Sequence, residues 1–180
     1  MRRFQSRAPV MPSRRTRGLL LLLASTFLVL AGPRTADAQL IESADVYAKI
    51  VNPITIQKLA DLDYGIIAAG GGGGTMRIRP DGTHTFTGDV VSQGGDPHPA
   101  EFEVSGYAGL VYNVSMPSSI ELADSGGNSM TVARFTSSNN GSGTLLGGLD
   151  TFTVGATLRV SPSQAPGEYT GTFDVTVAYQ

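Results

Sequence analysis

The residues from Glu168 to Tyr179 form the clearest alternating pattern in the chain and constrain its fold more than any other stretch. Bulky apolar and aromatic side chains share one parity, whereas threonine, aspartate and alanine fill the other. The apolar set is Tyr169, Phe173, Val175, Val177 and Tyr179. A period of two is typical of a β-strand that buries one face and exposes the other. We therefore predict a β-domain whose last strand spans these residues.

Eight further short runs have strand character and are separated by glycine-rich breaks. They are Ala44 to Val51, Ile54 to Leu59, Thr75 to Arg79, Thr83 to Thr87, Ala100 to Ser105, Leu110 to Met116, Met130 to Phe135 and Thr151 to Val160. Short strands at such spacing are typical of a sandwich, and no amphipathic helix of three turns interrupts them. The predicted fold is all-β: a single immunoglobulin-like β-sandwich of about seven to nine short antiparallel strands.

The N-terminal residues have the organisation of a signal peptide. Six arginines precede an apolar run from Leu19 to Ala31, and Ala36-Asp37-Ala38 fits a small-residue cleavage site. We predict cleavage before Gln39, which makes 1–38 the signal peptide and 39–180 the secreted domain. A retained membrane anchor is the alternative, but Ser25 and Thr26 break the run, which is short for a span of roughly 20 residues.

This interpretation sets the compartment and the charge of the mature chain. Export by the general secretory route would deliver it to the periplasm, the cell surface or the extracellular space. Seven of the 13 basic and one of the 15 acidic residues precede Gln39, which leaves six basic and 14 acidic residues and a net charge of −8. Nucleic acid is disfavoured as a partner because phosphate binding needs clustered bases. No second apolar run follows, so we expect no membrane-embedded helix.

Two motifs resemble binding loops but lack the residues that such loops need. Gly70 to Gly74 could cradle a phosphate, yet no lysine, serine and helix follow, and a flexible hairpin loop is the better interpretation. Asp61 to Gly65 opens like a calcium loop but lacks the later oxygen ligands. We interpret it as a turn whose carboxylates cap backbone amides.

The residue types of enzyme sites are present without the spacing that chemistry requires. His84 and His98 fit no compact metal motif, and the chain has no cysteine to assist them. No Gly-x-Ser-x-Gly sequence occurs, and Glu101 and Glu103 are a pair that exposed strand faces commonly carry. We therefore predict no catalytic residues, no metal or cofactor ligands and no enzymatic activity.

Four motifs carry a resemblance to known families: Pro53 to Ile56, Leu62 to Gly65, Gly155 to Leu158 and Gly167 to Tyr179. Over essentially the whole chain after residue 38, the sequence resembles a family of secreted bacterial proteins, the domain of unknown function DUF4402. More distantly it is similar to the spore-coat-protein-U-like subunits of archaic chaperone–usher pili. It departs from that second group because it has no cysteine pair.

The pilus resemblance implies an incomplete sandwich. Its groove would be filled first by a periplasmic chaperone and then by the N-terminal extension of the next subunit, so the implied partners are copies of itself and a chaperone–usher system. The predicted donor strand begins after the cleavage site and carries Leu40, Ala44, Val46, Ala48 and Ile50, interrupted by Glu42. The predicted acceptor is the set Tyr169, Phe173, Val175, Val177 and Tyr179. A second interpretation stays open, in which Ala44 to Ile56 is the first strand of the chain's own sheet.

Three classes of function are compatible with these patterns. The first is a non-enzymatic exported structural protein, a fimbrial or surface-layer subunit that assembles by β-strand addition. The second is a self-contained sandwich that binds a glycan or small ligand, although the chain has no tryptophan to form a sugar platform. The third is a small outer-membrane barrel, which usually needs strands of roughly 9 to 11 residues and aromatic girdles.

Overall fold

The computed structural model describes residues 40–180, which form ten β-strands and no helix. The predicted signal peptide, 1–38, and the cleavage position before Gln39 lie outside the described residues. A boundary after Val46 separates a short N-terminal segment from a body, residues 47–180, that contains all ten strands. Over the described range, no helical segment has the length and apolarity needed to cross a membrane.

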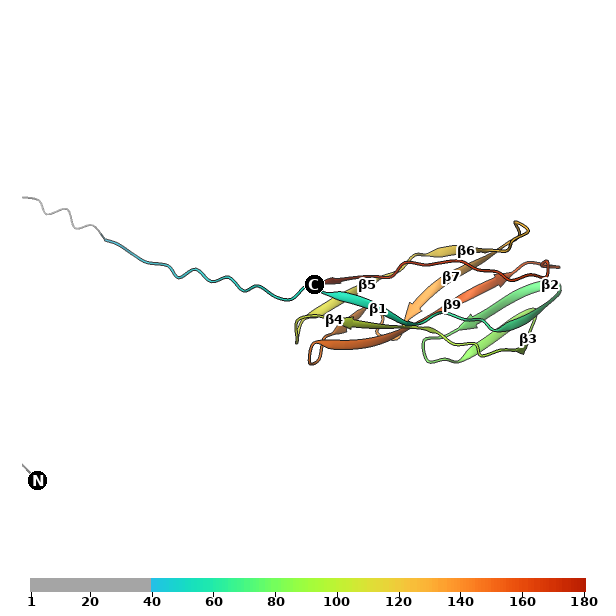
Figure 1. The fold of residues 1–180 in the computed structure, drawn as a ribbon, viewed down its shortest axis with the longest axis horizontal. Helices are drawn as coiled ribbons and strands as arrows, with labels where there is room; N and C mark the ends of the chain where they lie inside the picture. Colours follow the sequence, from blue (N-terminus) through green and yellow to red (C-terminus); the bar gives the residue numbers. More distant parts are fainter. Residues whose placement is uncertain (1–39) are drawn as a thin grey trace, which may run out of the picture. The chain divides into compact units, whose positions relative to one another are not determined.

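The larger of two antiparallel sheets has seven strands (Figure 1). They are β1 (Thr55–Ala60), β2 (Ile66–Ile78), β3 (His84–Gly94), β4 (Ala100–Ser105), β6 (Ser119–Ala123), β7 (Ser129–Ser137) and β9 (Leu149–Val160). Strand β9 is central, because one edge pairs with β4 and then β2 while the other edge pairs with β7. Strand β3 extends the sheet from β2, β1 extends it from β4, and β6 extends it from β7.

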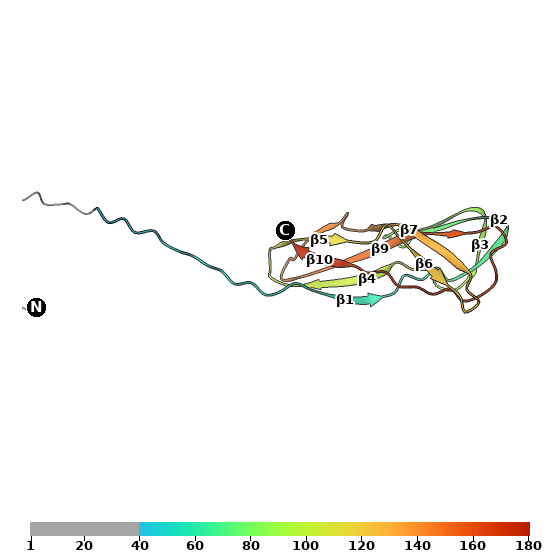
Figure 2. The same ribbon diagram turned by 90° about the horizontal axis from the view of Figure 1, so that it is seen from above.

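The smaller sheet has three strands in the order β10–β5–β8. Figure 2 labels two of them, β5 and β10. They are β5 (Val111–Ser115), β8 (Ser142–Thr144) and β10 (Thr176–Tyr179). The predicted all-β sandwich is therefore confirmed, with ten strands in two antiparallel sheets.

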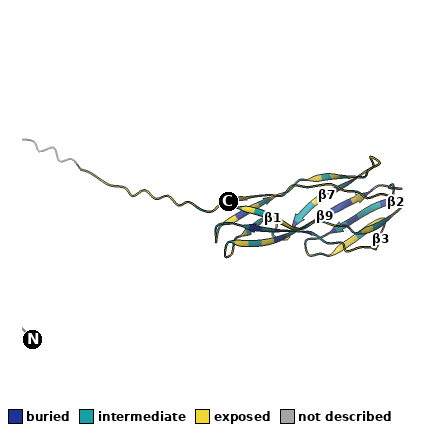
Figure 3. Cartoon of the chain, in the orientation of Figure 1, coloured by how far each residue is buried: buried dark blue, intermediate teal, exposed yellow. Residues whose placement is uncertain are grey.

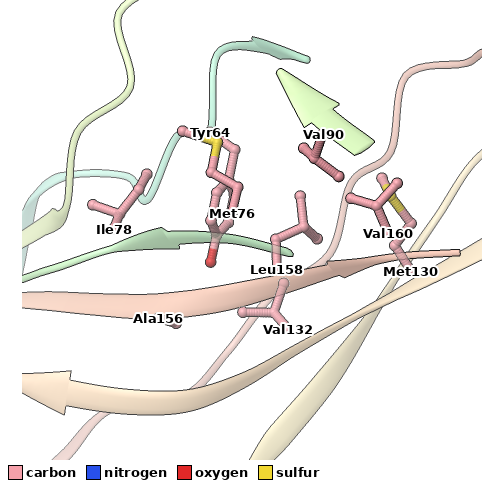
Figure 4. Packing of buried hydrophobic residues seen from close by; sticks show 9 residues of the cluster. All are labelled: Tyr64, Met76, Ile78, Val90, Met130, Val132, Ala156, Leu158 and Val160. Atoms are coloured by element: carbon pink, nitrogen blue, oxygen red, sulfur yellow. The ribbon is translucent and has the colours of Figure 1, made fainter. Parts of the chain in front are cut away.

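The hydrophobic core is divided into two clusters that are covered differently. The cluster around Phe102, Phe152 and Tyr112 lies between the larger sheet and strands β5 and β10. The other cluster, built on Met76 and Leu158, takes its buried residues from β2, β3, β7 and β9 and from Tyr64 in the loop after β1 (Figure 4). No residue of this second cluster comes from the smaller sheet. Half of the larger sheet's inner face is therefore left without an opposing strand among residues 40–180.

The alternation in β9 explains why it holds both clusters. Its even-numbered residues from Phe152 to Val160 are buried, whereas Thr151 and Arg159 on the opposite parity are exposed. Figure 3 shows β9 largely in the buried colour, while β3 at the sheet's edge is mainly exposed. One strand thus supplies an apolar inner face and a polar outer face, as a period of two requires.

The last predicted strand has the expected faces but is shorter than predicted. Tyr169, Phe173 and Val175 are half-buried and their neighbours of opposite parity are exposed, yet regular pairing begins only at Thr176. The segment makes one bridge to β6, between Thr170 and Ala123, before it continues into β10 of the smaller sheet. The prediction of a strand from Glu168 to Val175 was wrong because this segment crosses between sheets and finds no continuous ladder there.

The structure also differs from the prediction at the N-terminal residues and at two strands that the sequence did not predict. Residues 44–54 form no strand, and the first strand starts at Thr55, so the interpretation of Ala44 to Ile56 as the chain's own first strand was wrong. Strands β6 and β8 were not predicted, and β8 begins within the glycine-containing run 137–143, where the sequence indicated a break between strands. Strand β4 has the predicted bounds, Ala100 to Ser105.

The Gly70–Gly74 run is not a hairpin loop but a bulged part of β2. Ala69 pairs with Val90 and Gly74 pairs with Gly88, so four glycines lie opposite the single residue Asp89. The Gly72 amide donates to Asp89 Oδ2 at 2.9 Å, and a Cβ at Gly72 would lie 2.6 Å from that oxygen. Glycine is needed at the end of this run, because a Cβ at Gly74 would lie 2.0 Å from the Thr87 carbonyl oxygen and Gly73 has a φ of 65°.

Two core tyrosines provide a matched test of hydroxyl pairing. Tyr112 donates to Asp150 Oδ2 at 2.8 Å, whereas the buried Tyr64 hydroxyl has no partner among the described residues. Removing a paired hydroxyl should cost about 1 to 2 kcal/mol, whereas removing an unpaired one costs nothing or is stabilising. We expect Tyr112→Phe to lower the free energy of unfolding in urea and Tyr64→Phe to leave it unchanged or raise it. Equal losses of unfolding free energy in the two variants would contradict the difference in hydrogen bonding between these hydroxyls.

The same tyrosines predict a loss of stability at alkaline pH. Burial raises the pKa of Tyr64, and burial followed by the hydrogen bond and charge of Asp150 raises the pKa of Tyr112. In the unfolded chain both phenols ionise near about pH 10. Because the folded protein retains these protons to higher pH, its stability is fully present below that pH and falls above it. The urea midpoint should fall less steeply above about pH 10 in Tyr64→Phe than in the wild type, and identical slopes would refute this.

Candidate functional site

The half of the core that faces no strand is buried beneath two loop segments, and an apolar groove of about 930 Å³ lies between them. Its floor is the inner face of the larger sheet and includes Met130, Val132, Leu158 and Val160. Strand β6 adds Ile120 and Leu122, and β4 adds Ala100 and Phe102. These residues come from the alternating apolar parity of four adjacent strands, so the floor is continuous across the sheet.

One wall of the groove is the stretch that follows β1 and begins β2. It includes 61–69, with Tyr64 buried and Ile66 61% exposed. As predicted for this turn, a carboxylate caps an amide: Asp63 Oδ1 accepts from the Gly65 amide at 2.7 Å. Asp63 also exchanges two backbone hydrogen bonds with His98 at 3.0 Å each. The wall is therefore held by its own backbone contacts, and Asp61 at its start forms an ion pair with Lys58.

The opposite wall is the C-terminal segment from Gln164 to Phe173. Tyr169 fixes its curvature, because its hydroxyl donates to the Ala165 carbonyl at 2.7 Å and accepts from Gln164 Nε2 at 2.8 Å. Phe173 packs against Phe135 with a centroid separation of 4.9 Å. The wall is thus anchored by side chains at both ends, while its backbone between the Thr170 bridge and β10 has no strand partner in the described chain.

Both walls of the groove have an unpaired backbone edge within the described residues. Residues 66–69 of β2 pair with β3 alone, and 171–173 form no ladder. An unpaired edge presents backbone N–H and C=O groups that can bind another extended chain. The groove therefore combines an apolar floor with backbone edges that can accept a strand, a combination that suits a peptide segment of alternating polarity.

The predicted acceptor residues are divided between the groove and the second core cluster. Tyr169 and Phe173 line the groove. Val175, Val177 and Tyr179 instead pack against the cluster around Phe102. The Tyr179 hydroxyl accepts from the Tyr107 amide at 2.7 Å and donates to the Asn52 carbonyl at 2.9 Å.

The predicted donor residues are all exposed. Leu40, Ala44, Val46, Ala48 and Ile50 lie in residues 40–54, which form no strand or bridge. Leu40, Val46 and Ile50 are 95%, 93% and 96% exposed. Farther along, Lys49 Nζ lies 4.4 Å from the centroid of the Tyr107 ring. Large apolar side chains are thus left in solvent directly before the first strand.

The sequence reasoning missed the groove residues of β6 and the start of β2. Ile120 and Leu122 alternate with exposed residues in a run of only five, and that alternation was the available signal. Ile66 and Ile67 precede the glycine run, which hid the strand that contains them. The groove itself leaves no local sequence signal, because its walls are more than 90 residues apart in the chain, at Asp61–Ala69 and Gln164–Phe173.

The residues considered for metal or acid–base chemistry are dispersed. His84 is exposed at the start of β3, and His98 lies half-buried beside Pro99, to whose carbonyl its Nδ1 lies 3.2 Å. Glu101 and Glu103 share the outer face of β4, as predicted. Among residues 40–180, no three acidic, histidine or cysteine side chains are grouped closely enough to hold a metal ion.

The comparisons with known proteins agree with one of the two resemblances. No curated protein matches the chain. The family described as "Domain of unknown function (DUF4402)" matches residues 54–179, from the residue before β1 to the last residue of β10. The match covers both sheets and both walls of the groove, and the chain belongs to the DUF4402 family.

Proposed function

We propose that this protein is a non-enzymatic exported structural subunit that joins copies of itself by β-strand addition. The N-terminal residues 40–50 of one copy would occupy the apolar groove of another. The observation that carries this proposal is that, among residues 40–180, no strand lies opposite the cluster built on Met76 and Leu158, and a groove of about 930 Å³ runs over it. A single strand from a second molecule would supply what the fold lacks.

The groove suits a strand for two physical reasons. Its floor is apolar, so side chains on one face of an inserted strand would be removed from water. Its two flanking segments offer free backbone edges, so an inserted strand can form ladders on both sides. Neither feature alone distinguishes a strand from a small apolar ligand, but their combination does.

The N-terminal residues have the properties of a donor. In residues 40–50, the five predicted donor positions have one parity and all are exposed. Leaving Leu40, Val46 and Ile50 in water is unfavourable, at about 25 cal/mol per Å² of apolar surface that could otherwise be buried. Insertion into a groove would recover this free energy.

A second copy is a better occupant of the groove than the chain's own N-terminal residues. Lys49 and Asn52 are held by Tyr107 and Tyr179 beside the end of the body where β1 starts. The groove wall starts where β1 finishes, and six residues of strand span about 20 Å. For the N-terminal residues to enter the groove of their own copy, the chain would have to reverse direction near Lys49 and Asn52, which these contacts hold in place. Insertion into the groove of another copy needs no such reversal.

The same proposal includes export of the protein and two partners, a periplasmic chaperone and further copies of the chain. Removal of the signal peptide would release the donor residues at the new N-terminus, and a periplasmic chaperone would cover the groove until another copy replaces it. Support for a non-enzymatic role comes from the groove's lining, in which the Asp63 carboxylate is engaged by the Gly65 amide and Asp61 by Lys58. The net charge of −8 after residue 38 also disfavours nucleic acid as a partner.

Deletion of residues 39–50 tests the donor. The shortened protein should stay folded and monomeric, because every strand starts at or after Thr55. The full mature chain should instead form multimers that survive SDS and separate only on boiling. A synthetic peptide of residues 39–50 should bind the shortened protein. A monomeric full-length chain, together with a peptide that does not bind, would refute strand addition and leave the groove as a site for a small apolar ligand.

Two exposed branched aliphatic residues on neighbouring strands provide a matched test of the groove. Ile66 lines the groove and is 61% exposed, whereas Val91 is 53% exposed on neighbouring β3 and does not line it. We expect Ile66→Asp to weaken binding of the 39–50 peptide by at least about tenfold, because insertion would bury the new charge. Val91→Asp should leave the affinity unchanged and serves as the matched control. Equal effects would show that the peptide binds elsewhere.

The donor's parity can be tested in the peptide itself. Val46 is on the predicted inward parity and Ser43 on the outward parity. In a strand, residues of opposite parity face opposite sides. Val46→Asp should therefore abolish binding to the shortened protein in a fluorescence polarisation titration, whereas Ser43→Asp should be tolerated. The reverse order would show that the donor inserts with the other parity facing the groove.

A further inference from the structure

A second site lies on the opposite face of the sheet from the groove. In the pairing of the larger sheet, Arg159 of β9 lies between Thr75 of β2 and Thr131 of β7. Two residues earlier, Thr157 lies between Arg77 of β2 and Ala133 of β7. These residues alternate with Met76, Leu158 and Val132, which face the core. The outer face of three adjacent strands therefore carries arginine and threonine side chains in two neighbouring rows.

These strands form a small recess that we name the arginine pocket. It is lined by Gly74, Thr75, Arg134, Thr157 and Arg159 and has a volume of about 290 Å³. This size is near the lower end of ligand sites, which is about 300 Å³. The pocket suits a group no larger than a phosphate or a single acidic sugar ring.

The backbone at Arg134 is strained, and the strain places this residue in the pocket. Arg134 has a φ of 57°, a left-handed conformation that bulky residues rarely adopt. It lies where the register between β7 and β9 shifts, between Ala133 and Thr136. Such a bulge redirects a side chain, and strained residues of this kind are concentrated at functional sites. Glycine would fit this position without strain, so an arginine here needs another reason.

Two buried polar atoms beside the pocket have no partner. Thr157 is 7% exposed, yet its Oγ1 makes no hydrogen bond among the described residues. The Nε of Arg77, whose residue pairs with Thr157 across the sheet, is also buried and unpartnered. Buried polar groups are paired in more than nine of ten cases, so two orphans in one row indicate a group that the protein alone does not supply.

The charges at the pocket are also unbalanced. Its lining includes two of the six basic residues after position 38, Arg134 and Arg159, and Arg77 pairs with the lining residue Thr157. Among residues 40–180, the ion pair present joins Lys58 and Asp61, and none of these arginines forms one. Glu121 of β6 pairs with Thr131 of β7, which in turn pairs with Arg159, so one strand separates this carboxylate from Arg159. Like charges held together in this way are stabilised by a bound anion.

We propose that the arginine pocket binds an oxyanion, a carboxylate or phosphate group, between the guanidinium groups of Arg134 and Arg159 with the Thr157 hydroxyl as a donor. Arginine suits both groups because its planar fork matches two oxygens at once. The proposal goes beyond strand addition and is independent of it. Groove and pocket lie on opposite faces of β9, so a copy engaged in assembly would still present the pocket to solvent.

Calorimetric titration of the mature protein at low salt tests this site. The probes are inorganic phosphate and glucuronate, with neutral glucose as the control ligand. At least one of the two anions should bind with 1:1 stoichiometry, and the tighter one identifies the chemical group. Binding should weaken with salt. Absence of saturable binding by both anions, or equal binding of glucose, would overturn the proposal.

Substitutions locate the binding site and separate it from folding. We expect Arg159→Gln and Arg134→Gly each to weaken anion binding by about tenfold or more, and Thr157→Val to weaken it less. Arg79→Gln removes the same charge from a residue that does not line the pocket and should leave the affinity unchanged. Arg134→Gly is decisive, because glycine relieves the strained φ and the urea midpoint should not fall while binding is lost. Undiminished binding in this variant would refute the site.

Discussion

The antiparallel pairing of β9 on both of its edges is the interaction on which the rest of the structure depends. Strands β4 and β2 share one edge of β9 and β7 takes the other, so three distant parts of the chain meet on one strand. Its inward residues, from Phe152 to Val160, contribute to both core clusters. Because a buried backbone must have its hydrogen bonds satisfied, this strand can be central only if neighbours cover both edges.

The second constraint is that the smaller sheet is too short to cover the larger one. Strands β10 and β5 cover the cluster around Phe102, while Leu158 and Val132 face a groove whose walls are loop segments. The walls are ordered by their own contacts, such as those of Asp63 and Tyr169, rather than by a continuous sheet. A fold completed by a strand from another copy would explain why no strand of residues 40–180 lies opposite this half of the core.

The alternation of β9 also relates the two proposed sites. Its inward parity, including Leu158, forms the groove floor, and its outward parity, Thr157 and Arg159, forms the arginine pocket. The thickness of one sheet therefore separates the proposed assembly surface from the proposed anion site. If copies assemble through the groove, the same pocket is repeated along the assembly, and weak binding at each copy could add up through multivalency.

Local patterns in the sequence determined which residues face the core and where most strands lie. A period of two is a property of neighbouring residues, so β4 and the buried parity of 169–179 were predicted correctly. Only the tertiary structure decided the pairing. The segment before β10 has strand-like faces but no ladder, the glycine run joins β2 because Asp89 packs against it, and the groove exists because segments about 100 residues apart remain separated. Hydrogen-bond partners, bulges and the strained Arg134 depend on contacts between distant residues, which no local pattern specifies.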